Sequence, residues 1–113
     1  MKTGGQHRVV LVTCGSLLEA RRIARSAVTK GFAACVNITL SPVESIYAWK
    51  GKVEKAREYL LILKTSATRL AELEREVKRL HSYDVPEFMA LKVTEGSPSY
   101  LGWLSSSVAK SRK

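Results

Sequence analysis

The segment from His81 to Glu87 holds the residues best suited to chemistry, because it combines an imidazole, a phenol and two carboxylates. His81 follows a helical pattern, and Glu87 lies beyond Pro86 at the start of an apolar strand pattern. Imidazole and carboxylate both bind divalent transition metals, but a tight site needs three or four protein ligands. Cys14, at the end of the first apolar run, is the natural third ligand, and a group from a neighbouring subunit is the alternative.

Each candidate ligand also has a purely structural interpretation. His81 could hydrogen-bond free carbonyls at a helix end. Cys14 could be an ordinary core residue, since free cysteines are often buried, although amides at the start of the next helix would favour a thiolate there. Glu87 could point back at His81 across the connection. The sequence leaves these alternatives open.

A second group of residues suggests a ligand cleft or an interface. Tyrosine and tryptophan carry polar ends that seek partners when buried, which suits a pocket rim. Glu58 and Lys64 flank an apolar strand pattern over 59–63 and could supply charge to the same pocket, or could be solvated strand ends. The candidate cleft residues are Tyr47, Trp49, Glu58, Lys64, Tyr83 and Asp84.

Two amphipathic helices are predicted around these residues. Ser16 and Glu19 match a capping box, and Gly31 supplies a stop signal, so a first helix is expected between them. Its core face carries Ala20, Ile23, Ala24, Ala27 and Val28. A second helix places Leu70, Leu73, Val77 and Leu80 on one face and ends before Pro86.

Apolar runs and alternation predict the strands between and beside these helices. The expected strands are Val9–Val12, Phe32–Leu40, Val43–Trp49 with a turn at Gly51, Tyr59–Leu63 and Phe88–Val93. Ser97 and Pro98 can cap and start a short final helix through Leu101 and Leu104.

This order predicts an α+β fold, a ferredoxin-like βαββαβ sandwich with an antiparallel sheet, both helices on one face and a short C-terminal helix. Residues 1–113 are expected to form a single domain, with an ordered core over about 8–108 and flexible termini. The second and third strand regions are longer than this fold needs. A long apolar edge must be covered or paired with another chain, so an oligomer is expected.

The composition argues against several functional classes. Nineteen Lys and Arg against ten Asp and Glu give a formal charge of +9, which invites an anionic partner, yet no RNA-recognition pattern occurs, so no specific nucleic-acid function is expected. No phosphate-binding glycine loop and no nucleophile–base constellation occurs, so the chain is not expected to be an enzyme. Two cysteines without a signal peptide or a membrane span predict a cytoplasmic location.

The chain resembles the CutA-type divalent-cation-tolerance family over about residues 8–108. The resemblance rests on six ordered segments, which are Val12-Thr-Cys14, Ala33-Ala-Cys-Val-Asn37, Ser45-Ile-Tyr-Ala-Trp-Lys-Gly-Lys52, Leu61-Ile-Leu-Lys-Thr65, His81-x-Tyr-x-Val-Pro-Glu87 and Tyr100-Leu-x-Trp103. It implies a ferredoxin-like subunit, a cytoplasmic homotrimer with strand pairing between subunits, and a link to divalent metals, copper especially. Two positions depart from the family pattern: Ser82 replaces the usual Pro, and Asp84 replaces the usual Glu or Gln.

Two functional hypotheses follow. In the first, a trimeric cytoplasmic protein binds copper or another divalent cation through His81, Glu87 and Cys14 and acts in metal tolerance and the response to metal ions. Its folding does not require the metal, because the chain is long enough to form a core without one. In the alternative, which the resemblance of the family's trimer to PII-type proteins implies, a signalling or scaffold module binds a small anionic ligand or an unknown protein partner in clefts between subunits.

Overall fold

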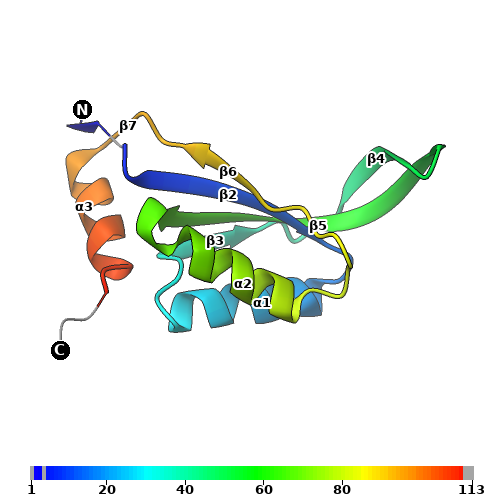
Figure 1. Ribbon diagram of the computed structural model, residues 1–113, viewed down its shortest axis with the longest axis horizontal. Coiled ribbons are helices and arrows are strands. Elements are labelled where there is room, and N and C mark those ends of the chain that lie inside the picture. The colour runs from blue at the N-terminus through cyan, green and yellow to red at the C-terminus, as the bar shows by residue number, and fades with distance from the viewer. Residues whose placement is uncertain (1, 4, 111–113) are drawn as a thin grey trace.

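The computed structural model describes residues 2–3 and 5–110 and consists of an antiparallel sheet with helices packed against it (Figure 1). In chain order the elements are β1 (Lys2–Thr3), β2 (His7–Cys14), α1 (Leu17–Thr29), β3 (Cys35–Ile38), β4 (Val43–Trp49), β5 (Lys52–Ser66), a 3-10 turn (Ala67–Arg69), α2 (Leu70–Leu80), β6 (Met89–Lys92), β7 (Glu95–Gly96) and α3 (Pro98–Ser107). The strand order in the sheet is β3-β5-β2-β6, with β4 paired to β5 outside this path, and β1 and β7 form a short separate ribbon.

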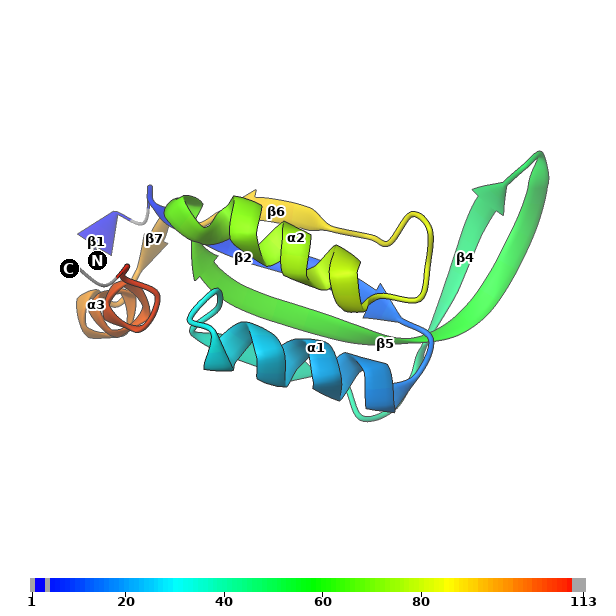
Figure 2. The ribbon, with the colours of Figure 1, turned by 60° about the horizontal axis from the view of Figure 1, so that its bottom comes forward.

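The two longer helices form one layer and the sheet the other. Helices α1 and α2 lie side by side over one face of the sheet, and α3 lies beyond its end (Figures 1 and 2). The apolar residues buried in the main core are Val10, Val12, Cys14, Ala20, Ile23, Ala24, Ala27, Ala33, Leu61, Leu63, Leu73 and Val77. The predicted α+β class with an antiparallel sheet is therefore confirmed.

The predicted limits of α1 are confirmed. Ser16 Oγ accepts a hydrogen bond from the Glu19 amide at 3.1 Å, and Gly31 follows the helix with a φ of 74°. Glycine adopts this left-handed conformation without the steric cost that a Cβ brings. Val28 was expected on the core face but is 44% exposed, because it lies at the edge of the apolar stripe rather than at its centre.

The strand β5 is much longer than its apolar run predicts. It begins at Lys52, not at Tyr59, because its outer half pairs with β4 in a hairpin that projects from the sheet (Figure 2). The two strands are joined at Lys50 and Gly51, whose φ angles of 50° and 79° match the two-residue turn that suits strand twist. Backbone pairing, not burial, therefore holds the polar residues of this segment in a strand.

Two other strands are shorter than predicted. The expected strand over 32–40 is reduced to β3, because the amides of Phe32 and Ala33 bond the Ala27 carbonyl and close the end of α1. Leu40, the last residue of the expected strand, lies outside β3 and is 70% exposed. The expected strand over 88–93 is reduced to β6, which pairs with β2 only through Met89–Lys92.

Part of the N-terminal segment expected to be flexible makes contacts with the rest of the fold. Lys2–Thr3 pairs with Glu95–Gly96, and the His7 side chain is only 3% exposed. Its Nε2 lies 2.8 Å from Ser105 Oγ and 3.2 Å from the Leu101 carbonyl, so it links β2 to α3. Residues 1, 4 and 111–113 of the expected flexible termini lie outside the described residues.

A buried carboxylate joins the two helices of the outer layer. Glu76 on α2 is 6% exposed and accepts hydrogen bonds from Ser26 Oγ and from Lys30 Nζ, the latter at 3.0 Å. Ser26 lies on α1, and Lys30 directly follows this helix. Arg79 Nη2 donates to the same oxygen at 2.7 Å. These donors, Arg79 first and Ser26 second, lower the pKa of Glu76 to about 2.

Glu76→Gln is expected to reduce the free energy of unfolding by about 2 kcal/mol at neutral pH. Because the folded pKa is about 2 and the unfolded value is near 4.3, the contribution is complete above about pH 5 and is lost as pH falls towards 2. Denaturant unfolding from pH 7 to 3, at fixed protein concentration, should show a shallower pH dependence in the variant. The control is Glu74→Gln, whose partner Lys78 is exposed, and an equal effect there would contradict this assignment.

Candidate functional site

His81 ends α2 and is held by hydrogen bonds on both ring nitrogens. Its side chain is buried, and its amide bonds the Val77 carbonyl at 2.9 Å. Nε2 donates to the Thr13 carbonyl at 2.7 Å, and Nδ1 accepts from the Tyr83 amide at 3.1 Å. Because a carbonyl only accepts and an amide N–H only donates, Nε2 is the donor and Nδ1 the acceptor in these two contacts.

Cys14 lies against this imidazole at the end of β2. Its side chain is fully buried on the helix-facing side of the sheet, with Sγ 3.7 Å from His81 Nε2. Burial first, and the charges of Glu19 and Glu58 second, raise the pKa of the Cys14 thiol to about 12. The expected thiolate is therefore not the stable form here, because loss of solvation outweighs any effect of the following helix.

Glu19 joins Cys14 and His81 in a cluster, although the sequence did not indicate Glu19 as a possible ligand. Its Oε2 lies 3.5 Å from His81 Nδ1 and accepts from Ser82 Oγ at 3.3 Å. One ligand atom each from Cys14, Glu19 and His81 lies within 4.8 Å of the others. From the sequence Glu19 was expected only in the capping box, although its place in the first helical turn after Cys14 was a signal for this proximity.

Glu87, the third metal ligand predicted from the sequence, lies outside this cluster and lines a hollow in the surface. This hollow of about 420 Å³ brings together five of the six predicted cleft residues, all except Lys64. Its walls are formed by Thr13, Tyr47, Trp49, Glu58, Tyr83, Asp84, Val85 and Glu87. The structure thus places Cys14 beside His81, whereas Glu87 lies among the residues predicted to form the cleft.

Tyr83 connects the cluster to the hollow. Its hydroxyl donates to Glu58 Oε2 at 2.9 Å, and its ring lies 4.7 Å from the His81 ring, centroid to centroid. Burial first, and then the hydrogen bond and charge of Glu58, raise the pKa of Tyr83 to about 12. Tyr83 therefore contacts both the His81 ring and Glu58 of the hollow.

Lys64 lies outside the hollow. It is on the same face of β5 as Glu58 because side chains alternate along a strand, but the six intervening steps separate the two by about 20 Å. Its Nζ donates to Asn37 Oδ1 and lies 3.9 Å from Cys35 Sγ on the neighbouring β3. Charge for the cleft therefore comes from the carboxylates and not from Lys64.

Comparison with known proteins identifies the family. A family model for the CutA1 divalent ion tolerance protein matches residues 8–107. The divalent-cation tolerance protein CutA of Archaeoglobus fulgidus is 40% identical over 102 residues, covering 90% of this chain and 98% of the relative. Its counterpart from Thermus thermophilus is 46% identical over 96 residues, covering 85% and 92%. By contrast, the chain spans only 56% of the mouse protein CutA and 54% of the Arabidopsis thaliana chloroplastic protein.

Solved structures agree with this relationship. The divalent cation tolerance protein of Thermus thermophilus superposes with a TM-score of 0.89 at 43% identity, covering 91% of this chain and 99% of that one. The Oryza sativa CutA1 structure gives a TM-score of 0.89 at 42% identity, covering 97% and 100%. Sequence, fold and family model agree over nearly the whole chain, which therefore belongs to the CutA1 divalent ion tolerance family.

Proposed function

We propose that this chain is a non-catalytic protein of divalent-cation tolerance that binds a metal ion, copper in particular, through Cys14, His81 and a carboxylate. The observation that carries the proposal is the convergence of Cys14, Glu19 and His81 within 4.8 Å. Sulfur, nitrogen and oxygen donors suit copper and zinc better than magnesium or calcium, and copper(II) stands above zinc(II) in affinity order. The names of the relatives as divalent-cation tolerance proteins support the same role.

Metal binding at this cluster requires a local rearrangement. Coordination through His81 Nε2 replaces its bond to the Thr13 carbonyl, whereas coordination through Nδ1 replaces the bond from the Tyr83 amide. Glu19 is the nearer carboxylate. Glu87 remains the alternative in this proposal, because it follows His81 on the connection over 81–88, which contains no helix or strand.

Metal affinity is expected to rise with pH. The Cys14 thiol has a pKa of about 12 and must lose its proton to bind a metal ion, so each bound ion displaces a proton throughout the neutral range. Zinc(II) affinity measured by competition with a chromophoric chelator should increase about tenfold per pH unit between pH 6 and 8. Cys14→Ser should flatten this slope, and a pH-independent affinity in the unaltered chain would exclude the thiol as a ligand.

We also propose that the chain forms a ferredoxin-like subunit of a homotrimer. The strand order β3-β5-β2-β6, with α1 and α2 on one face, supports the subunit fold. On the projecting hairpin, Ile46 and Val53 are 68% and 79% exposed. Their register places both on the face opposite Tyr47 and Trp49. Apolar side chains exposed on a protruding hairpin favour burial against another copy of the chain.

The location that we propose for the chain is the cytoplasm. Two free cysteines suit a reducing compartment such as the cytoplasm. However, two plant relatives are named chloroplastic, and the Archaeoglobus fulgidus structure is described as periplasmic. Over the described residues, no helix has both the length and the apolar character needed to cross a bilayer. The comparisons do not favour the PII-like signalling alternative.

Calorimetric titration of the metal-free chain tests the metal proposal directly. Under anaerobic conditions, copper(II) should bind with one saturable site per chain, zinc(II) more weakly, and magnesium without measurable heat. Circular dichroism of the metal-free chain should show the same secondary structure, because the core forms without the cluster. Equal binding of magnesium and zinc, or no saturable copper binding, would overturn the proposal.

A further inference from the structure

The hollow beside Tyr83 contains a buried carboxyl group, that of Glu58, which forms no ion pair with another described residue of the chain. Glu58 is 7% exposed and faces this hollow. Its one hydrogen bond in the described part of the chain comes from the neutral hydroxyl of Tyr83, and none of the ion pairs formed there includes Glu58. Buried charges in proteins are normally paired, since burial without a partner costs several kcal/mol. A cation from outside the chain would supply the missing partner.

The walls of the hollow favour the same kind of ligand. The register of the hairpin places Tyr47, Trp49 and Glu58 on one face of the two strands, and Tyr83 closes the hollow from the other side. The faces of Tyr and Trp rings attract cations, most strongly those that lose their water easily. Asp84 and Glu87 add two exposed carboxylates at the rim.

The charge of the hollow is opposite to that of the whole chain. The chain carries a formal charge of +9, yet three of the eight lining residues are acidic and none is Lys or Arg. Lys64, the one basic residue predicted for this cleft, lies instead beside Cys35 and Asn37. The local field of such a site attracts cations, although the net positive charge of the chain repels them at longer range.

A metal ion fits this hollow poorly. A hard cation needs several oxygen ligands at close range, and the ligand atoms that converge among the described residues are those of Cys14, Glu19 and His81, not the three carboxylates of the hollow. An organic ammonium ion needs no such convergence, because it can contact a ring face and one carboxylate at a time. Spaced carboxylates between aromatic walls thus suit an elongated cation with spaced charges.

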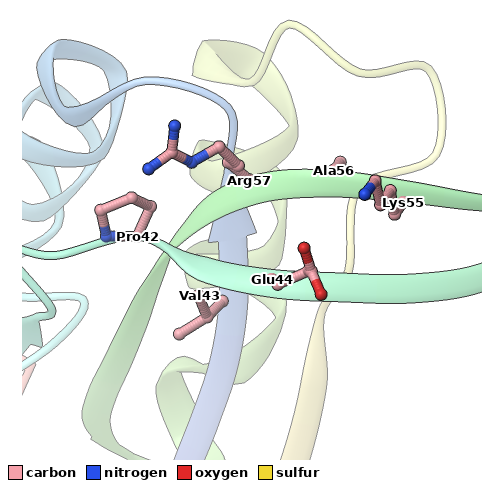
Figure 3. A pocket seen from close by; sticks show the side chains of 6 residues that line it. All are labelled: Pro42, Val43, Glu44, Lys55, Ala56 and Arg57. Carbon is pink, nitrogen blue, oxygen red and sulfur yellow. The ribbon is translucent and has the colours of Figure 1, made fainter.

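Another hollow on the described part of the chain provides a contrast. It has a volume of about 520 Å³ and lies at the base of the hairpin, where Glu44 is directly opposite Arg57 and close to Lys55 (Figure 3). It has no aromatic wall, and its acidic residue already has cationic neighbours. Glu44 is therefore a matched control for Glu58.

We propose that the hollow formed by Tyr47, Trp49, Glu58, Tyr83, Asp84 and Glu87 binds an aliphatic di- or polyamine. One ammonium group pairs with Glu58 between the aromatic rings, and a second pairs with the rim carboxylates. The methylene chain between them covers the apolar parts of the rings. This site is separate from the Cys14 cluster and does not depend on the proposed metal function.

Calorimetry on the full-length chain, in its natural oligomeric state and after removal of metal with EDTA, tests the proposal. Spermidine and putrescine, at about 150 mM salt, should bind with a dissociation constant below about 1 mM. The uncharged 1,4-butanediol, and magnesium at the same ionic strength, should give no saturable heat. Binding of magnesium or the diol as tight as that of putrescine, or no saturable spermidine binding up to about 10 mM, would overturn the proposal.

Variants locate the binding. Glu58→Gln keeps an acceptor for the Tyr83 hydroxyl but removes the charge, and should weaken spermidine binding about tenfold or more. Trp49→Leu changes an exposed side chain and should weaken spermidine binding about fivefold. If circular dichroism shows that Glu58→Gln does not fold, the spermidine affinity of Trp49→Leu tests the location of the site instead. Glu44→Gln and Cys14→Ser should bind as the unaltered chain does. Unchanged affinity in both Glu58→Gln and Trp49→Leu would exclude this hollow as the site.

Discussion

Cys14→Ser is expected to lower the affinity of the chain for copper(II) and zinc(II) by at least about 100-fold. The thiol is fully buried beside His81, with Sγ 3.7 Å from Nε2, and it is the one soft donor of the three-residue cluster. Serine is nearly the same size, so the core should be little disturbed, whereas its hydroxyl is a poor ligand for these metals. Calorimetric titration of both proteins gives the change in affinity directly.

The matched control is Cys35→Ser. Cys35 is the other free cysteine, half-buried on β3 beside Lys64 and remote from the cluster. If both substitutions reduce copper affinity equally, or if neither does, the thiol of Cys14 is not the ligand. His81→Ala is a less informative variant, because it also removes the hydrogen-bond partners of the Thr13 carbonyl and the Tyr83 amide, so lost binding and lost stability would be confounded.

The identity of the carboxylate ligand is decided by a second pair of variants. Glu19→Gln should weaken copper binding about tenfold or more if the cluster binds metal in the arrangement described. Glu87→Gln should then have little effect, since this residue lines the neighbouring hollow. The reverse result would show that the connection over 81–88 rearranges to bring Glu87 to His81.

The double variant Ile46→Glu and Val53→Glu is expected to convert a trimer into monomers at about 10 µM protein. The two side chains lie near each other on one face of the hairpin and are exposed in the single chain. Burying two carboxylates at each subunit contact should cost several kcal/mol. The subunit should still fold, because neither residue contributes to the core. Light scattering coupled to size exclusion measures the mass.

The control for this variant is Leu18→Glu. Leu18 is 70% exposed, similar to Ile46, but lies on α1 and not on the hairpin. It should leave the trimer intact, so that loss of assembly can be assigned to the hairpin and not to added negative charge. A monomeric mass for the unaltered chain would exclude the homotrimer, and dissociation by Leu18→Glu would place the interface elsewhere.

The local elements of this fold could be predicted from the sequence because their determinants are local. The limits of α1 follow from Ser16 and Gly31, and Val43–Trp49 forms a strand as its alternation predicts. The core face of α2 is likewise read from its helical period, since Leu73 and Val77 are both buried. Local propensity and pattern agree with the tertiary fold at these places, so no other information was needed.

The sequence by itself also determined which residue types could do chemistry, and the pairing of Cys14 with His81 was among its alternatives. Only the tertiary structure decided that Glu19 joins them and that Glu87 and Lys64 lie elsewhere. The physical reason is that a ligand site or cleft depends on distances between elements. A helix turn brings Glu19 back to the end of β2, whereas an extended strand carries Lys64 about 20 Å from Glu58.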